Sequence, residues 1–135
     1  MQPFTATLYQ AMGPTQLAAL VRTRWRCIEP PRGGERFLYL KCRQRYAEMI
    51  ARQRYRRHEG AGFVVSLQLP ARVMASFTLE TVAYEEHLEY RVPVHSLAML
   101  QSALHGPLRL VAVFRAHESY SVAPGKVAPA ALLAV

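Results

Sequence analysis

A cluster of glutamates is the part of the sequence whose residue types suit acid–base or electrostatic chemistry. Four of the nine glutamates lie within ten positions, at Glu80, Glu85, Glu86 and Glu89. Carboxylates this close repel one another, and such a group in an arginine-rich chain is a candidate for binding or catalysis. For Glu85 and Glu86 a solvated hairpin turn is the simpler interpretation. We single out Glu89 because it shares one face of a predicted strand with His87.

Basic residues form a second candidate site. The chain of 135 residues has 17 lysines and arginines against nine acidic residues, a net charge of +8, and segment 22–57 holds twelve basic residues but only three glutamates. Guanidinium groups match phosphate oxygens because they present a planar fork of donors. Arg45, Arg52 and Arg56 fall on one face of a predicted helix and are candidate nucleic-acid or phosphate contacts. The alternative is a coding bias that places arginine on ordinary solvated surface.

Several catalytic and metal-binding motifs are absent. The sequence has no aspartate, no GxxxxGK[ST] phosphate loop, no GxSxG nucleophile motif, no HExxH and no CxxC. These absences exclude P-loop NTPases and aspartate-based chemistry, and we expect no metal site. Two cysteines, Cys27 and Cys42, make no disulfide framework.

The elements that must position these residues follow from periodicity and breakers. Pro14, Pro30-Pro31, Gly33-Gly34 and Gly60 mark boundaries. Strands are predicted over 5–11, 36–42, 63–69, 78–84, 87–92 and 108–115, and helices over 15–23, 44–58 and 93–104, with a short helical turn in 70–77. The core face of the second helix is predicted to hold Tyr46, Ala47, Ile50, Ala51 and Arg54.

This order mixes hairpins with helical crossovers, which indicates an α+β domain rather than a regular doubly wound sheet. We place a single domain at residues 1–115 and an Ala/Pro-rich C-terminal tail at 116–135. The longest apolar stretches are much shorter than the roughly 18 residues of a membrane span. No basic-then-apolar leader opens the chain, so we expect a cytoplasmic protein that does not enter a membrane.

Four segments together resemble a known family. They are Leu8-Tyr9-Gln10, Phe37-Leu38-Tyr39 running into Arg45-Tyr46-Ala47, Gly60-Ala61-Gly62-Phe63, and His87-Leu88-Glu89-Tyr90-Arg91-Val92-Pro93. The pattern is similar to small bacterial proteins labelled "ADP-ribosylation/crystallin J1", and the element order resembles the ADP-ribosyltransferase fold. The resemblance implies a split, mixed or antiparallel β-sheet core with about three helices, which grips NAD in a cleft.

The resemblance also implies roles for single residues. Tyr9 and Gln10 would position the nicotinamide ribose, although Gln10 stands where relatives have arginine. Tyr39 and Tyr46 would stack on nicotinamide. Glu89 would be the catalytic glutamate and His87 would orient it or the acceptor. Arg43 or Arg45 would meet the NAD pyrophosphate.

The function implied is that of a mono-ADP-ribosyltransferase or NAD glycohydrolase that uses NAD as substrate, without a metal. Breaking the bond between ribose and nicotinamide develops positive charge on the sugar, which a fixed carboxylate stabilises. Two alternatives remain open: a basic module that binds nucleic acid or nucleotides, and a catalytically silent member of the same fold.

Overall fold

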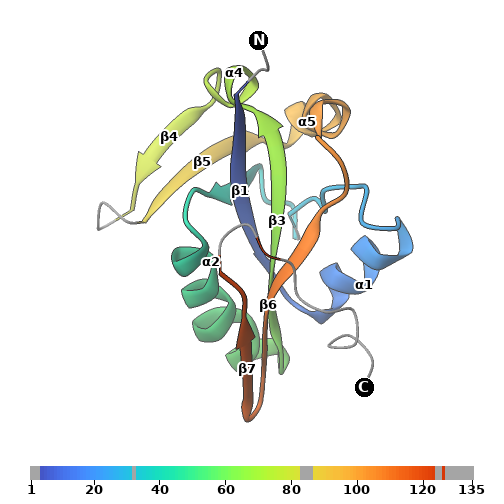
Figure 1. The fold of residues 1–135 in the computed structure, drawn as a ribbon, viewed down its shortest axis with the longest axis vertical. Helices are drawn as coiled ribbons and strands as arrows, with labels where there is room; N and C mark the ends of the chain where they lie inside the picture. Colours follow the sequence, from blue (N-terminus) through green and yellow to red (C-terminus); the bar gives the residue numbers. More distant parts are fainter. Residues whose placement is uncertain (1–3, 32, 83–86, 124–125, 127–135) are drawn as a thin grey trace.

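The computed structural model describes residues 4–31, 33–82, 87–123 and 126. The chain forms one α+β domain in which helices cover both faces of a seven-stranded sheet (Figure 1). Its elements are β1 (Thr5–Met12), α1 (Pro14–Arg22), β2 (Phe37–Lys41), α2 (Gln44–Ile50), η1 (Ala51–Arg56), α3 (Arg57–Glu59), β3 (Gly62–Pro70), α4 (Ala71–Met74), β4 (Thr78–Thr81), β5 (Leu88–Pro93), η2 (Val94–Ser96), α5 (Leu97–Ala103), β6 (Arg109–Arg115) and β7 (Glu118–Ser121).

The sheet has the strand order β4-β5-β2-β1-β3-β6-β7, and every strand pair in the described residues is antiparallel. The predicted α+β class is therefore confirmed, and of the two sheet types left open, the antiparallel one is found. The first three strands of this order and the last four form two parts that meet where β2 pairs with β1.

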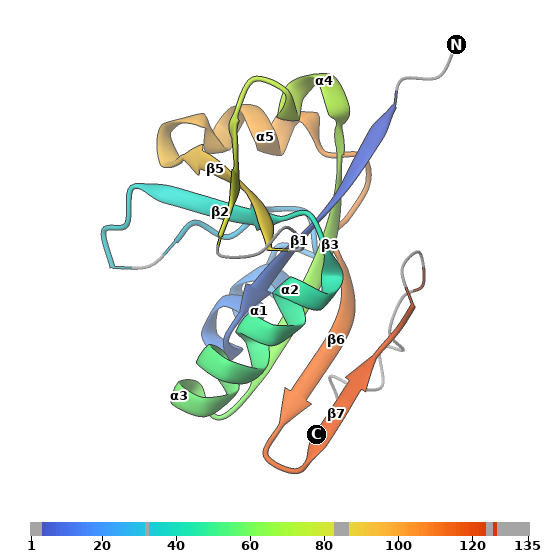
Figure 2. The ribbon, with the colours of Figure 1, turned by 90° about the vertical axis from the view of Figure 1, so that its left-hand side faces the viewer.

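The two parts are joined narrowly. β1 pairs with β3 along its whole length, from Thr5 to Met12, but with β2 only at Tyr9, which lies opposite Lys41. Figure 2 shows β2 and β5 running at an angle to β1 and β3. Lys41, which also pairs with Glu89 of β5, is thus the residue at which the two parts of the sheet are joined.

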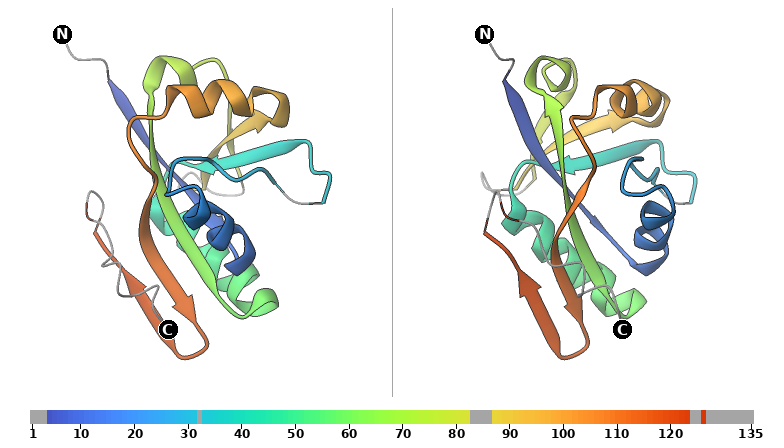
Figure 3. Two further views of the ribbon diagram at one scale, coloured as in Figure 1. Left: turned by 90° about the vertical axis from the view of Figure 1, so that its right-hand side faces the viewer. Right: turned by 45° about the vertical axis from the view of Figure 1, so that its right-hand side comes forward.

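Two clusters of buried side chains lie on opposite faces of the sheet, beneath the helices that Figure 3 shows on either side of it. The larger one includes Leu17 and Leu20 of α1 and Leu100 of α5. Each helix contributes to it because its apolar residues recur at helical spacing and so form one buried face. The smaller one places Ala47 and Ala51 of the long helix against the sheet. One face is thus covered by the long helix that α2, η1 and α3 form, whereas α1, α4 and α5 cover the other face.

The long helix, formed by α2, η1 and α3, contains a π-helical segment at Ala51–Arg56. Its i to i+5 hydrogen bonds advance the packed face by an extra residue. The prediction that Arg54 faces the core is therefore wrong: its side chain is 64% exposed, and Tyr55 packs against the smaller cluster in its place. Gly60, with a φ of +87°, ends the helix in the left-handed conformation that glycine favours.

The helix and β3 approach each other closely at Gly62. A Cβ atom at this position would overlap the backbone carbonyl of Ala51. The absent side chain thus sets how near the π-helical segment lies to the sheet.

Two boundaries differ from the predicted ones. Residues 118–121, expected in the tail, form β7 and pair with β6, so the sheet continues beyond residue 115. The strand predicted over 78–84 is described as Thr78–Thr81, while Tyr84, Glu85 and Glu86 lie outside the described residues. Among the described helices, none is long and apolar enough to cross a membrane.

Candidate functional site

Glu89 is a buried carboxylate near the joint between the two parts of the sheet. It lies on β5 opposite Lys41 of β2, and it is 7% exposed because the first turn of α2 covers it with Tyr46. The Tyr46 hydroxyl donates a hydrogen bond to Glu89 Oε1 at 2.9 Å, and Lys41 Nζ lies 3.5 Å from the same oxygen. We call Lys41, Tyr46, His87 and Glu89 the Glu89 cluster.

Burial shifts the titration of two members of the cluster. It lowers the pKa of Lys41, and the negative charge of Glu89 only partly opposes this effect. Burial, together with the hydrogen bond to Glu89, raises the pKa of Tyr46. Tyr46 therefore stays protonated at neutral pH and can serve as a donor to the carboxylate.

His87 extends the cluster on its outer side. Its ring stacks on the ring of Tyr46, with centroids 4.5 Å apart and planes 9° from parallel. Both rings line an open cavity of about 680 Å³, which we call the cationic cavity. Its other lining residues are Arg43, Arg45, Met49, Arg52 and Gln53.

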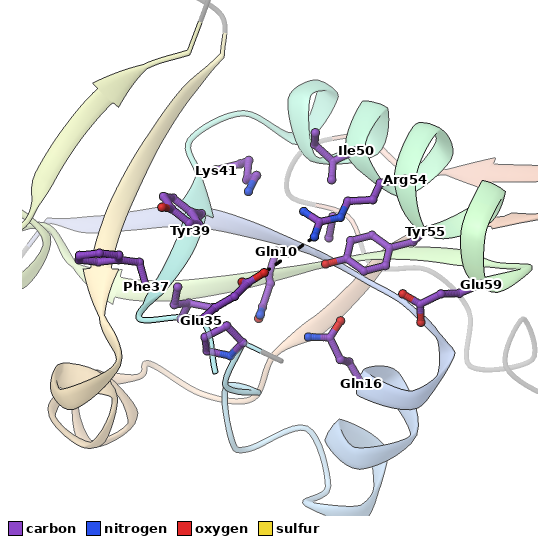
Figure 4. A pocket seen from close by; sticks show the side chains of 13 residues that line it. Gln10, Gln16, Glu35, Phe37, Tyr39, Lys41, Ile50, Arg54, Tyr55 and Glu59 are labelled. Carbon is purple, nitrogen blue, oxygen red and sulfur yellow. Dashed lines mark ion pairs between the residues drawn. The ribbon is translucent and has the colours of Figure 1, made fainter. Parts of the chain in front are cut away.

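A second cavity, of about 140 Å³, is lined in part by Lys41. We call it the Gln10 cavity; Figure 4 shows the side chains of Gln10, Arg54 and Tyr55 converging on it. Arg54 is paired there with Glu35 at 3.9 Å. Other lining residues include Gln16, Tyr39, Lys41, Ile50 and Glu59.

Gln10 has an unsatisfied buried acceptor. Its residue is 4% exposed and its Nε2 donates to the Glu29 carbonyl oxygen at 3.3 Å, whereas its Oε1 has no hydrogen-bond partner among the described residues. A buried amide oxygen without a partner costs folding free energy, so it commonly marks a place where water or a ligand binds.

Lys41 connects the two cavities to the carboxylate. Its Nζ lies 5.7 Å from the Tyr39 ring centroid and 5.6 Å from that of Tyr46, in addition to its contact with Glu89. Tyr39 and Lys41 line the Gln10 cavity, and Tyr46 and His87 line the cationic cavity. Glu89 itself is not among the described lining residues of either cavity, but its Oε1 contacts one lining residue of each, Lys41 and Tyr46.

Most of the predicted site residues meet here, but two lie elsewhere. Tyr9 is opposite Lys41 in the sheet, yet its side chain lines a different cavity beside Ser66 and Arg109. Arg56 lines neither the Gln10 cavity nor the cationic cavity; its guanidinium lies 3.5 Å from Ser119 Oγ and 5.9 Å from the centroid of the Phe114 ring, which Arg52 also approaches at 5.3 Å. Glu89, His87, Tyr39, Tyr46, Gln10, Arg45 and Arg52 belong to the two cavities or to the cluster between them.

Lys41 is the member that sequence reasoning missed. A lysine at the end of a short strand resembles an ordinary exposed residue. The signal that could have found it is composition, since the chain has 15 arginines and only two lysines. A compact ammonium can be buried against one carboxylate more readily than a guanidinium with five donors to satisfy.

No group of three or more potential metal ligands exists among the described residues. Comparison with known proteins found no matching family model, no matching curated protein and no matching solved structure. A functional assignment therefore depends on the geometry of the Glu89 cluster and its two cavities.

Proposed function

We propose that this protein cleaves the bond between nicotinamide and ribose in NAD, as a mono-ADP-ribosyltransferase or NAD glycohydrolase, with Glu89 as the catalytic carboxylate. The observation that carries the proposal is the buried Glu89 side chain, held at Oε1 by Tyr46 and Lys41. A carboxylate fixed in this way needs little reorganisation when positive charge develops on a nearby sugar.

The proposed reaction uses the two oxygens of Glu89 differently. Tyr46 and Lys41 both contact Oε1, so we assign the ribose hydroxyl to Oε2. The electrons of the glycosidic bond leave with nicotinamide, which departs as a neutral ring. The sugar carbon then forms a bond to an oxygen or nitrogen of the acceptor, or to water, and the acceptor loses a proton.

We also propose an ADP-ribosyltransferase-like split of the sheet, with the division at β1 and β2. Support comes from their single register pair, Tyr9 opposite Lys41. In this proposal the nicotinamide end of NAD lies beside Tyr39 in the Gln10 cavity. The volume of this cavity, about 140 Å³, suits one small planar ring. The unsatisfied Oε1 of Gln10 would accept a hydrogen bond there.

The test is nicotinamide release from NAD, measured by chromatography. We expect Glu89→Gln to lower the rate about 100-fold or more, since it removes the charge that stabilises the sugar cation. Glu80→Gln is a matched control, because Glu80 lies directly opposite Glu89 on β4 but pairs with Arg91 at 3.4 Å. NAD should also raise the melting temperature of the wild type and of the control.

Equal rates for the wild type and Glu89→Gln would refute the assignment of Glu89. If the folded wild type binds NAD but releases no nicotinamide, the alternative of a catalytically silent protein is favoured instead.

A further inference from the structure

The cationic cavity is a built recess rather than a scattered set of surface charges. Arg43, Arg45 and Arg52 line it together with the stacked rings of Tyr46 and His87. None of the described residues that line it is acidic. Two carboxylates contact lining residues: Glu89 accepts the hydrogen bond of Tyr46 at 2.9 Å, and Glu48 lies 3.8 Å from Arg52. The recess therefore keeps an excess of positive charge.

Aromatic rings beside guanidinium groups are the chemistry that recognises an unpaired nucleotide. Arginines contact the phosphates, and a base stacks on a flat side chain without needing a particular sequence. Here Tyr46 is buried, whereas its stacking partner His87 is only half-buried and is the more accessible ring. Bases within a duplex already stack on each other, so this pair favours a single strand.

The recess also touches the proposed reaction centre. Tyr46 lines the cavity and donates its hydroxyl hydrogen bond to Glu89. A nucleic-acid strand held by the arginines would thus approach Glu89 from the side of Tyr46. Nicotinamide, which we place in the Gln10 cavity, would approach from the side of Lys41.

We infer that the cationic cavity binds single-stranded nucleic acid, which is the acceptor substrate of the protein. The role as acceptor rests on the proposed function. The binding does not, because it can be measured without NAD.

The experiment is a fluorescence-anisotropy titration with a labelled single strand of about twelve nucleotides, as DNA and as RNA. We expect Arg45→Glu/Arg52→Glu to weaken binding about tenfold. The slope of log affinity against log salt should fall by about 1.4, since each single-strand phosphate contact contributes about 0.7. His87→Ala should weaken binding about fivefold or more through lost stacking.

A matched control separates the cavity from general charge. Arg26→Glu/Arg72→Glu changes the net charge by the same amount at two exposed positions outside both cavities, and it should keep nearly full affinity. Unlabelled duplex of the same sequence, poly-glutamate and inorganic phosphate serve as competitors, and each should displace the strand poorly.

The inference is overturned if the control variant loses as much affinity as the cavity variant, or if duplex competes as well as single strand. Equal displacement by poly-glutamate would point to an acidic protein partner instead. Nicotinamide release is scored separately with NAD alone, so a failure of the catalytic proposal is distinguishable from a failure of strand binding.

Discussion

At the scale of single residues, the hydrogen bond from Tyr46 to Glu89 is the contact whose energetic effect can be isolated most cleanly. Both groups are buried, at 6% and 7% exposure, and the donor lies 2.9 Å from the acceptor oxygen. A buried hydrogen bond to a charged group contributes about 1.5–3 kcal/mol to stability. This contact is therefore part of the folding free energy as well as of the site.

We expect Tyr46→Phe to lower the free energy of unfolding by about 1.5–3 kcal/mol at neutral pH, since among the described residues Glu89 then keeps Lys41 as its one partner. Urea denaturation measures this change. Tyr39→Phe is the control, because no hydrogen bond of its hydroxyl is recorded among the described residues, and it should alter stability little.

The same pair predicts an alkaline pH dependence. The folded pKa of Tyr46 is raised above its ordinary value of 10.0, so above that pH the unfolded chain loses a proton that the folded chain retains. This contribution to stability is complete below pH 10.0 and is lost as pH rises toward the folded pKa. The decline should be shallower in Tyr46→Phe, and an identical decline would contradict the expectation.

Residue patterns singled out three of the four members of the Glu89 cluster. Period-2 alternation placed His87 and Glu89 on one strand face, and helical periodicity placed Tyr46 on a core face. Neither pattern could show that Tyr46 covers Glu89 or that Lys41 pairs with it. Those contacts depend on the turn at Cys42 and Arg43, which brings α2 back over β2 and β5.

At the scale of elements, the close approach of η1 and β3 gives a sharp prediction about packing. Gly62→Ala should lower the free energy of unfolding by about 1–3 kcal/mol, because the new methyl group overlaps the rigid Ala51 carbonyl. Gly13→Ala is the matched control. Its methyl group would meet the carboxylate of Glu59, the far end of a flexible side chain that can move aside.

Chemical denaturation of both variants tests this prediction. If Gly13→Ala loses as much stability as Gly62→Ala, the overlap with the Ala51 carbonyl is not the cause of the loss at Gly62, and the prediction fails.

Element bounds were largely readable from the sequence, whereas the winding of the long helix was not. The strands and helices lie close to their predicted ranges because proline, glycine and apolar period mark them clearly. A π-helical turn leaves no such mark: it arises from packing against β3 and changes which side chains face inward. Arg54 was assigned to the core face for that reason, although Tyr55 packs there in its place.

At the scale of the whole molecule, the two parts of the sheet should differ in local stability. β1 and β3 are paired along their full length and covered on both faces, whereas β4, β5 and β2 join them through one register pair. We expect backbone amides of β2 and β5 to exchange with deuterium faster than those of β1 and β3.

Native-state hydrogen exchange followed by mass spectrometry checks this expectation. Equal protection of Leu40 in β2 and Val65 in β3, both fully buried, would show that the sheet opens only as one unit.

Both outer strands of the sheet are short. β4 and β7 have four residues each, and each carries a glutamate, Glu80 and Glu118. An exposed strand edge is a template on which another chain can add, and brevity and charge are two ways in which proteins prevent this. The fold thus offers another chain little free strand edge on which to grow a fibre.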